Sequence, residues 1–196
     1  MARQFAVTWD YRCPFARNAQ EALVQGLKEG RDWHVRFWPF SLDQIHVEEG
    51  DTPVWERALD APGTGGVRAL LWGIAVRDAF PDQFLDFHLA AFRARHDEGQ
   101  KIAEGSVLRA VAESVGLDAD AVAGEVASGR PLKALEAEHT EAVDRYAVFG
   151  VPTIIDGDEA VFVRLMDRGN VDDFAHALDL VGSTRLNEFK RTKIPR

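Results

Sequence analysis

One cysteine occurs among the 196 residues of this chain: Cys13, in the stretch WDYRCPFARNAQEAL. A thiol reacts as its thiolate, and an ordinary cysteine has a pKa of about 8.5. Pro14 follows it, at the point where an alternating strand pattern gives way to a helical one. Proline suits the first turn of a helix, because the N–H that it lacks would have had no partner there. The pattern therefore places Cys13 at a helix N-terminus, where free N–H groups and the helix dipole favour the thiolate.

The neighbours of Cys13 carry groups that can act on a thiolate or on a substrate. Arg12 and Arg17 are cations that favour a nearby thiolate or bind a substrate carboxylate, and the alternative is that both are surface arginines. Tyr11 can hydrogen-bond the sulfur or stack on a substrate, while Asp10 can be a simple turn residue. For Cys13 itself the alternative is a buried structural thiol. Its position at a strand–helix junction, followed by proline, favours the reactive thiol.

Two hydrophobic periodicities frame this junction. Apolar residues alternate over 5–9, which predicts a strand, and recur at spacings of three and four over 14–30, which predicts an amphipathic helix. Residues 32–40 predict a second strand that Pro39 closes. Strand, helix and strand in this order predict a parallel pair with a right-handed crossover.

The middle of the chain, residues 52–149, predicts helices throughout, with Ser106 and Asp118 as N-caps. Two short apolar strands then flank a DG pair at 156–157, which predicts a hairpin that can extend the same sheet. Residues 170–181 predict a last amphipathic helix, with Asn170 as its cap. We expect the individual helices of the middle block within 65–80, 81–96, 106–117, 118–129 and 131–150.

The composition narrows the possible functions. A net charge of −9 argues against a nucleic-acid partner, which needs a basic face. We expect no membrane segment, because no apolar run reaches about 20 residues. The absence of a signal-peptide core at the start predicts a cytoplasmic protein. We expect no metal site, because the six histidines and one cysteine form no ligand pattern. A Cys–His hydrolase would need a histidine near Cys13, and His34 and His46 are open candidates.

Two motifs, CPFA at 13–16 and GVPT at 150–153, enclose the helical block. Together with the element order, they resemble the DsbA-like branch of the thioredoxin superfamily. The resemblance implies an α/β, thioredoxin-like fold with an inserted all-helical subdomain. We expect a discontinuous thioredoxin-like domain at 1–50 and 150–182, a helical insertion at 52–149 and a C-terminal tail at 183–196.

The resemblance also implies roles for the two motifs. It identifies Cys13 as the nucleophile and Pro152 as a cis-proline that faces it; the alternative is an ordinary trans proline that starts a strand. A cis bond there would let Val151 offer its N–H and C=O to an extended substrate or to a small thiol. We therefore expect the substrate or thiol to bind at Val151, Pro152 and Thr153, and the thiolate to be surrounded by Tyr11, Arg12, Pro14 and Arg17.

One position departs from the family pattern. Dithiol members carry Cys-X-X-Cys, whereas Ala16 occupies the fourth position here, so no disulfide can form within the motif. The same branch includes kappa-class glutathione transferases, 2-hydroxychromene-2-carboxylate isomerases and mycothiol-dependent reductases, which work with a small thiol. The resemblance therefore implies a monothiol oxidoreductase that performs thiol–disulfide exchange or small-thiol-dependent reduction through Cys13.

Several features of this interpretation stay open at the level of sequence. The expected co-substrate is glutathione or mycothiol, with no covalently bound cofactor and with a small thiol or disulfide as partner. The alternatives are a glutathione- or mycothiol-dependent transferase or isomerase, and a binding module without chemistry. The protein can be a monomer or a homodimer. Its Ala-, Arg-, Asp- and Val-rich composition suits an actinobacterial source.

Overall fold

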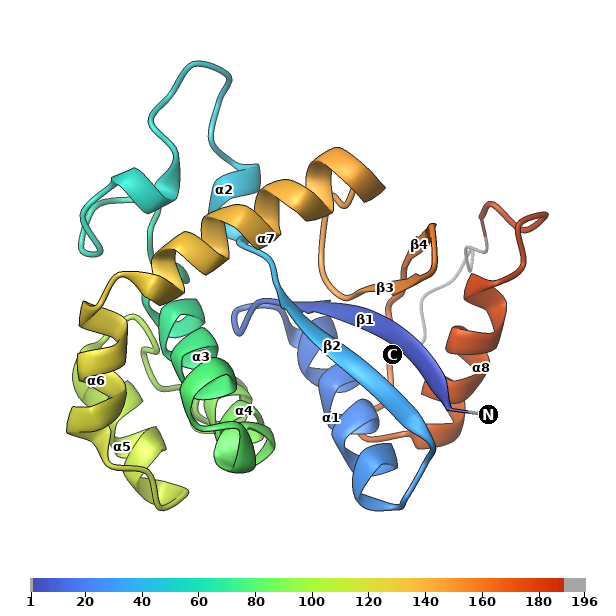
Figure 1. Ribbon diagram of the computed structural model, residues 1–196, viewed down its shortest axis with the longest axis horizontal. Helices are drawn as coiled ribbons and strands as arrows, with labels where there is room; N and C mark the ends of the chain where they lie inside the picture. Colours follow the sequence, from blue (N-terminus) through green and yellow to red (C-terminus); the bar gives the residue numbers. More distant parts are fainter. Residues whose placement is uncertain (1, 189–196) are drawn as a thin grey trace.

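A mixed β-sheet organises one half of the molecule (Figure 1). In the computed structural model, which describes residues 2–188, the sheet has four strands in the order β2-β1-β3-β4. β1 and β2 are parallel, and β3 is antiparallel to both β1 and β4. The parallel pair and the hairpin on the same sheet confirm the predicted topology. The strands are β1 (Arg3–Trp9), β2 (Trp33–Pro39), β3 (Thr153–Asp156) and β4 (Glu159–Phe162).

The central strand β1 is buried on both faces. Val7 and Trp9 point to one face and Ala6 and Thr8 to the other, and all four side chains are buried. Helix α1 (Pro14–Lys28) connects β1 to β2 and packs beside α8 (Val171–Val181), which contacts β3 and β4. The strand that leads to Cys13 is thus buried over the five residues Phe5–Trp9 that precede the active-site turn.

The second half of the molecule is a lobe of helices inserted between β2 and β3 (Figure 1). The prediction of helix throughout 52–149 is wrong at its start, because the proline- and glycine-rich segment before Val67 forms only one 3-10 turn. The structure places the elements of this lobe at α2 (Leu42–Ile45), η1 (Val54–Glu56), α3 (Val67–Ala79), α4 (Pro81–His96), α5 (Gly105–Ser114), α6 (Ala119–Ala127) and α7 (Arg130–Tyr146).

The helix caps test the sequence predictions residue by residue. The Asp118 side chain accepts the N–H groups of Asp120 and Ala121, and that of Asn170 accepts the N–H of Asp173, as predicted. Ser106 is not a cap: α5 begins one residue before it, after an extended Glu104 that makes no side-chain cap bond. The predicted tail at 183–196 lies partly outside the described residues.

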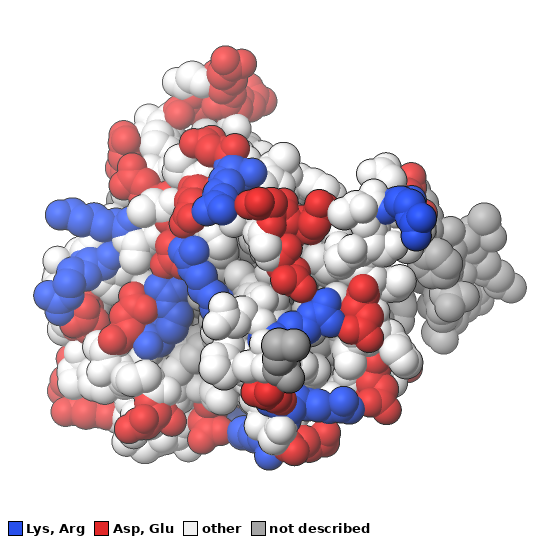
Figure 2. Space-filling view, turned by 45° about the vertical axis from the view of Figure 1, so that its right-hand side comes forward, with Lys and Arg blue, Asp and Glu red and all other residues white. Residues whose placement is uncertain are grey.

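The two lobes share one continuous hydrophobic core. Helix α3 approaches the end of β1 closely at Gly73, where an added Cβ would lie 2.5 Å from Trp9 and from the Tyr11 hydroxyl. No helix in the described chain is long and apolar enough to cross a membrane. On the face shown in Figure 2, basic side chains lie among acidic ones rather than in one continuous patch.

Candidate active site

The segment before α1 is folded into a tight turn by Asp10. The buried Asp10 carboxylate accepts the N–H of Arg12 at 2.9 Å and the N–H of Leu42 at 2.9 Å. Its backbone carbonyl accepts the N–H of Cys13 at 3.1 Å. Asp10 is therefore the turn residue that the sequence suggested, and it fixes the backbone that carries the sulfur.

Cys13 is the N-cap residue of α1. Its backbone is extended, with φ −88° and ψ 118°, and its Sγ accepts the N–H of Ala16 at 3.4 Å. The side chain is partly exposed. A sulfur in the N-cap position receives an N–H group that would otherwise have no partner in the helix.

A second chain segment faces this sulfur. The Val151–Pro152 peptide bond is cis, and the Cys13 thiol donates to the Val151 carbonyl at 3.3 Å. The residue after Pro152, Thr153, is buried, and its polar groups bond within the fold: its N–H donates to Thr8 Oγ1 and its hydroxyl donates to the Gly150 carbonyl, both at 2.8 Å. The two CPFA and GVPT segments thus meet, but Thr153 serves the fold and has no free polar group for a substrate.

Burial decides the ionisation of Cys13. It raises the pKa of the thiol above that of an ordinary cysteine, although the N–H groups of Ala16 and Phe15 and the cation of Arg164 act in the opposite direction. The charge of Asp10 raises the pKa further. The expectation that the helix N-terminus would yield a depressed pKa is therefore wrong, because the loss of hydration outweighs the helix N–H groups.

Tyr11 does not reach the sulfur. Its side chain is fully buried between the two lobes, and its hydroxyl lies 3.0 Å from Nδ1 of His88. Its ring packs against Trp9 and Phe92 at centroid distances of 4.6 and 4.8 Å. The missing side chain of Gly73 leaves the space that this ring occupies. The predicted role of Tyr11 beside the thiolate is wrong, and the residue holds the lobes together instead.

The two arginines near Cys13 in sequence are engaged elsewhere. Arg12 Nη2 lies 2.6 Å from Asp43, and Arg17 Nη1 lies 3.0 Å from Asp97. Neither arginine is among the charges that shift the pKa of Cys13. The prediction that they stabilise the thiolate is therefore wrong, because carboxylates distant in sequence bind them. Pro14 is exposed and opens α1, as predicted.

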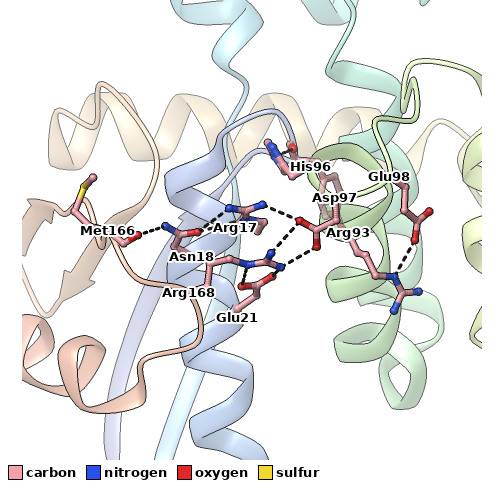
Figure 3. Close-up of polar contacts among 10 residues, drawn as sticks. Arg17, Asn18, Glu21, Arg93, His96, Asp97, Glu98, Met166 and Arg168 are labelled. Atoms are coloured by element: carbon pink, nitrogen blue, oxygen red, sulfur yellow. Dashed lines mark hydrogen bonds and ion pairs between the residues drawn. The ribbon is translucent and has the colours of Figure 1, made fainter. Parts of the chain in front are cut away.

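An ion-pair network ties three segments together beside α1 (Figure 3). Asp97, which caps the end of α4, binds both Arg17 and Arg168, and Arg168 also binds Glu21 at 2.6 Å. The amide of Asn18 donates to two backbone carbonyls of the same segment, 163–169, at 2.9 and 3.1 Å. The network fixes the segment that follows β4 against the first turns of α1.

Neither of the two candidate histidines, His34 and His46, forms a Cys–His pair with Cys13. His34 pairs with Gln4 in the sheet, at the opposite end of β1 from Cys13. His46 bonds the Leu42 carbonyl at 2.6 Å. His96, at the end of α4, lies 2.8 Å from the Tyr11 carbonyl and thereby contacts the turn that carries the sulfur. Mainly because of burial, its pKa is lowered, which keeps it neutral in that contact.

Arg164 is a residue of the site that the sequence patterns did not identify. Its guanidinium lies 5.1 Å from the ring centroid of Phe15 and 5.4 Å from that of Phe162, and its charge lowers the pKa of Cys13. Phe149, with 68% of its surface exposed, packs on Phe162 at 5.2 Å. The only signal in the sequence is that Arg164 closely follows the hairpin after Pro152.

Comparisons with known proteins fit this geometry. The family model for the DSBA-like thioredoxin domain matches residues 68–179. A search of curated proteins found no match. Among solved structures, oxidised BdbD from Bacillus subtilis is 16% identical with a TM-score of 0.63, and it covers 91% of this chain and 86% of its own. DsbA from Pseudomonas aeruginosa is 18% identical, with a TM-score of 0.61 and coverage of 94% and 85%.

A 2-hydroxychromene-2-carboxylate isomerase is similar over nearly the full length of both chains. It is 18% identical, with a TM-score of 0.65, and covers 93% of this chain and 96% of its own. At such identities these likenesses show the fold, which is thioredoxin-like with a helical insertion. Since the family model spans more than half of the sequence, this chain belongs to the DSBA-like thioredoxin domain family.

Proposed function

We propose that this protein is a monothiol oxidoreductase in which Cys13 exchanges with a low-molecular-weight thiol or disulfide. One observation carries the proposal: Cys13 is partly exposed, and its Sγ caps α1 and lies 3.3 Å from the Val151 carbonyl. The sulfur thus lies where the CPFA and GVPT segments meet, and Val151 itself is buried, so a ligand reaches this point from the side of Cys13.

The reaction begins when the Cys13 thiolate attacks one sulfur of a small disulfide. The S–S bond of that disulfide breaks, its other half leaves as a thiolate, and a mixed disulfide forms on Cys13. A second small thiol then attacks the mixed disulfide and restores the Cys13 thiolate. Each step forms one S–S bond and breaks one, so no external oxidant is needed. Because residue 16 is alanine, the second thiol must come from solution.

The raised pKa of Cys13 shapes both steps. Because burial raises the pKa of Cys13, a smaller fraction of this thiol than of an ordinary cysteine is ionised at neutral pH, but a thiolate of high pKa is the stronger nucleophile. The same property makes Cys13 a poor leaving group. The mixed disulfide is therefore expected to be long-lived, and the second step to limit turnover.

We also propose glutathione or mycothiol as the co-substrate, with no covalently bound cofactor and a small molecule as partner. A chain with one cysteine forms no internal disulfide, which agrees with a reducing compartment such as the cytoplasm.

A second candidate function is small-thiol-dependent isomerisation or transfer. Two observations favour it: the similarity to the isomerase over nearly the full length of both chains, and the burial of Cys13, which raises the pKa of its thiol. In that case the reacting sulfur belongs to the co-substrate, and Cys13 only orients it.

Substitutions of Cys13 separate the candidates. We would follow thiol-dependent reduction of 2-hydroxyethyl disulfide by the wild type, Cys13→Ser and Cys13→Ala, and detect the mixed disulfide by mass spectrometry. Exchange predicts a Cys13 adduct in the wild type and background rates in both variants. Wild-type turnover no faster than that of Cys13→Ala would overturn the proposal. Isomerase or transferase chemistry instead predicts that Cys13→Ser retains glutathione-dependent activity on a carbon substrate.

A further inference from the structure

Arg164 is a cation that packs on Phe15, two residues after Cys13, and the described part of the chain provides no carboxylate to pair with it. Within residues 2–188 no acidic side chain lies in ion-pair distance of Arg164, and its own side chain is exposed. Other arginines around α1 differ: Arg12, Arg17 and Arg168 each bind a carboxylate. A cation that is left unpaired while its neighbours are neutralised can bind an anion from solution.

The position of Arg164 is fixed by aromatic rings and by backbone contacts. Its guanidinium lies over the rings of Phe15, from α1, and Phe162, from β4. Phe162 in turn rests on the backbone of Gly150, where an added Cβ would lie 3.3 Å from its ring. The N–H of residue 163 donates to the Pro152 carbonyl at 3.0 Å. The arginine is thus anchored both to the helix that carries Cys13 and to the loop that faces it.

The contacts leave the binding edges of the guanidinium available. Aromatic rings interact with the flat faces of an arginine, while its five N–H donors point outward in the plane. No hydrogen bond within the described chain uses those donors. Carboxylates match this planar fork with two parallel hydrogen bonds.

We infer that Arg164 is a specificity-determining residue that binds an anionic group, a carboxylate foremost, on the thiol or disulfide that reacts at Cys13. The inference rests on the proposed function and names the substrate class for the same site. The exposed ring of Phe149 packs on Phe162, the ring that Arg164 also contacts, so Phe149 can cover an apolar part of a ligand held at Arg164.

This assignment distinguishes the co-substrates. A small thiol that carries carboxylates, as glutathione does, gains an ion pair at Arg164. A thiol without a carboxylate, as mycothiol, gains none. Carboxylate-bearing thiols and disulfides are therefore the preferred class.

The test compares two alkylating reagents that differ only in charge. Iodoacetate carries a carboxylate and iodoacetamide is neutral, so the ratio of their rates at Cys13 reports charge recognition and cancels the fraction of thiolate. Relative to a free small thiol, the wild-type ratio should be about fivefold higher, the upper range for an exposed ion pair. Arg164→Gln should bring the ratio to that of the free thiol, and Arg164→Lys should retain part of the gain.

A matched control removes the same charge elsewhere. Arg109→Gln on α5 changes the net charge equally and should leave the ratio at the wild-type value. High salt should lower the wild-type ratio and leave that of Arg164→Gln nearly constant, because salt screens exposed charges. The inference is overturned if Arg164→Gln and Arg109→Gln change the ratio of the iodoacetate and iodoacetamide rates equally, or if neither variant changes it.

A disulfide pair separates this inference from the proposed function. Exchange at Cys13 would be measured with anionic 3,3′-dithiodipropionate and neutral 2-hydroxyethyl disulfide. Suppose that both disulfides exchange with Cys13 and that Arg164→Gln does not change the ratio of their rates. The proposed function would then stand, and the role of Arg164 would be removed. No exchange with either, but an iodoacetate ratio that depends on Arg164, would remove the proposed function and retain the anion site.

Discussion

Acid should destabilise this protein through two buried histidines. Burial lowers the pKa of His88 to about 3 and that of His139 to about 4, against an ordinary value of 6.5. His88 lies among aromatic rings beneath the Tyr11 hydroxyl, and His139 accepts the backbone N–H of Ser41 at 3.2 Å. Neither ring has room for a hydrated charge, so each stays neutral in the folded state while the unfolded chain takes up protons.

The magnitude follows from this difference in proton binding. Since the folded pKa values are depressed, the stabilisation is fully present above pH 6.5 and is lost as the pH falls towards 4 and 3. At pH 5 each histidine removes about 2 kcal/mol from the free energy of unfolding, so the pair removes about 4 kcal/mol. Total stabilities of domains are about 5–15 kcal/mol, so this loss is large. The buried Asp10 acts in the opposite direction, because burial raises its pKa.

Urea unfolding followed by tryptophan fluorescence at several pH values between 7.5 and 5 would measure this loss. His88→Phe keeps an aromatic ring among its neighbours but removes one titrating group. The free energy of unfolding of this variant should therefore decrease less steeply than that of the wild type as the pH is lowered, because its unfolded chain takes up one proton fewer. His176→Gln, at an exposed position of α8, is the control and should follow the wild type. A wild-type stability that is flat from pH 7 to 5, or a slope that His88→Phe leaves unchanged, would refute the reasoning.

Two further predictions concern the fold that holds the site. Gly73→Ala should cost about 1–3 kcal/mol, because the new methyl would lie 2.5 Å from Trp9, whereas Gly124→Ala, in an open helical position, should gain up to about 1 kcal/mol. Thermal unfolding of the two variants checks this, and a loss in both would show that the close approach is not the cause. Asn170→Ala should remove the cap of α8 and cost about 1 kcal/mol, measured by urea unfolding, while Asn170→Asp, which keeps an acceptor, should stay close to the wild type.

Local patterns in the sequence were sufficient for the elements and their order. The strand–helix junction at Pro14, the DG hairpin and the Asn170 cap depend on residues close together in the chain, and each occurs where predicted. Ser106 shows the limit of such signals. A serine before an apolar run predicts a cap, but the backbone is already helical there because α5 starts earlier.

The electrostatics of the site depend on contacts that no local pattern contains. Arg12 and Arg17 adjoin Cys13 in sequence, yet Asp43 and Asp97 hold them, and the charge that favours the thiolate comes from Arg164. The sign of the pKa change is likewise a balance between helix N–H groups and burial by distant segments. The sequence alone identifies the groups that act on the pKa of Cys13, but it does not show which of their opposing effects is larger.

The charge of Arg164 has two effects on the reaction. As proposed, it binds the carboxylate of a substrate, and its charge also lowers the pKa of Cys13. A bound carboxylate neutralises that charge, so the pKa of Cys13 should rise further when an anionic ligand binds, and by linkage the protonated enzyme should bind that ligand more tightly. The thiolate in the complex must then rely on the helix N–H groups, above all that of Ala16 at 3.4 Å from the sulfur. Binding of the correct substrate thus costs ionisation of the nucleophile, and the reaction gains chiefly from holding the two sulfurs together.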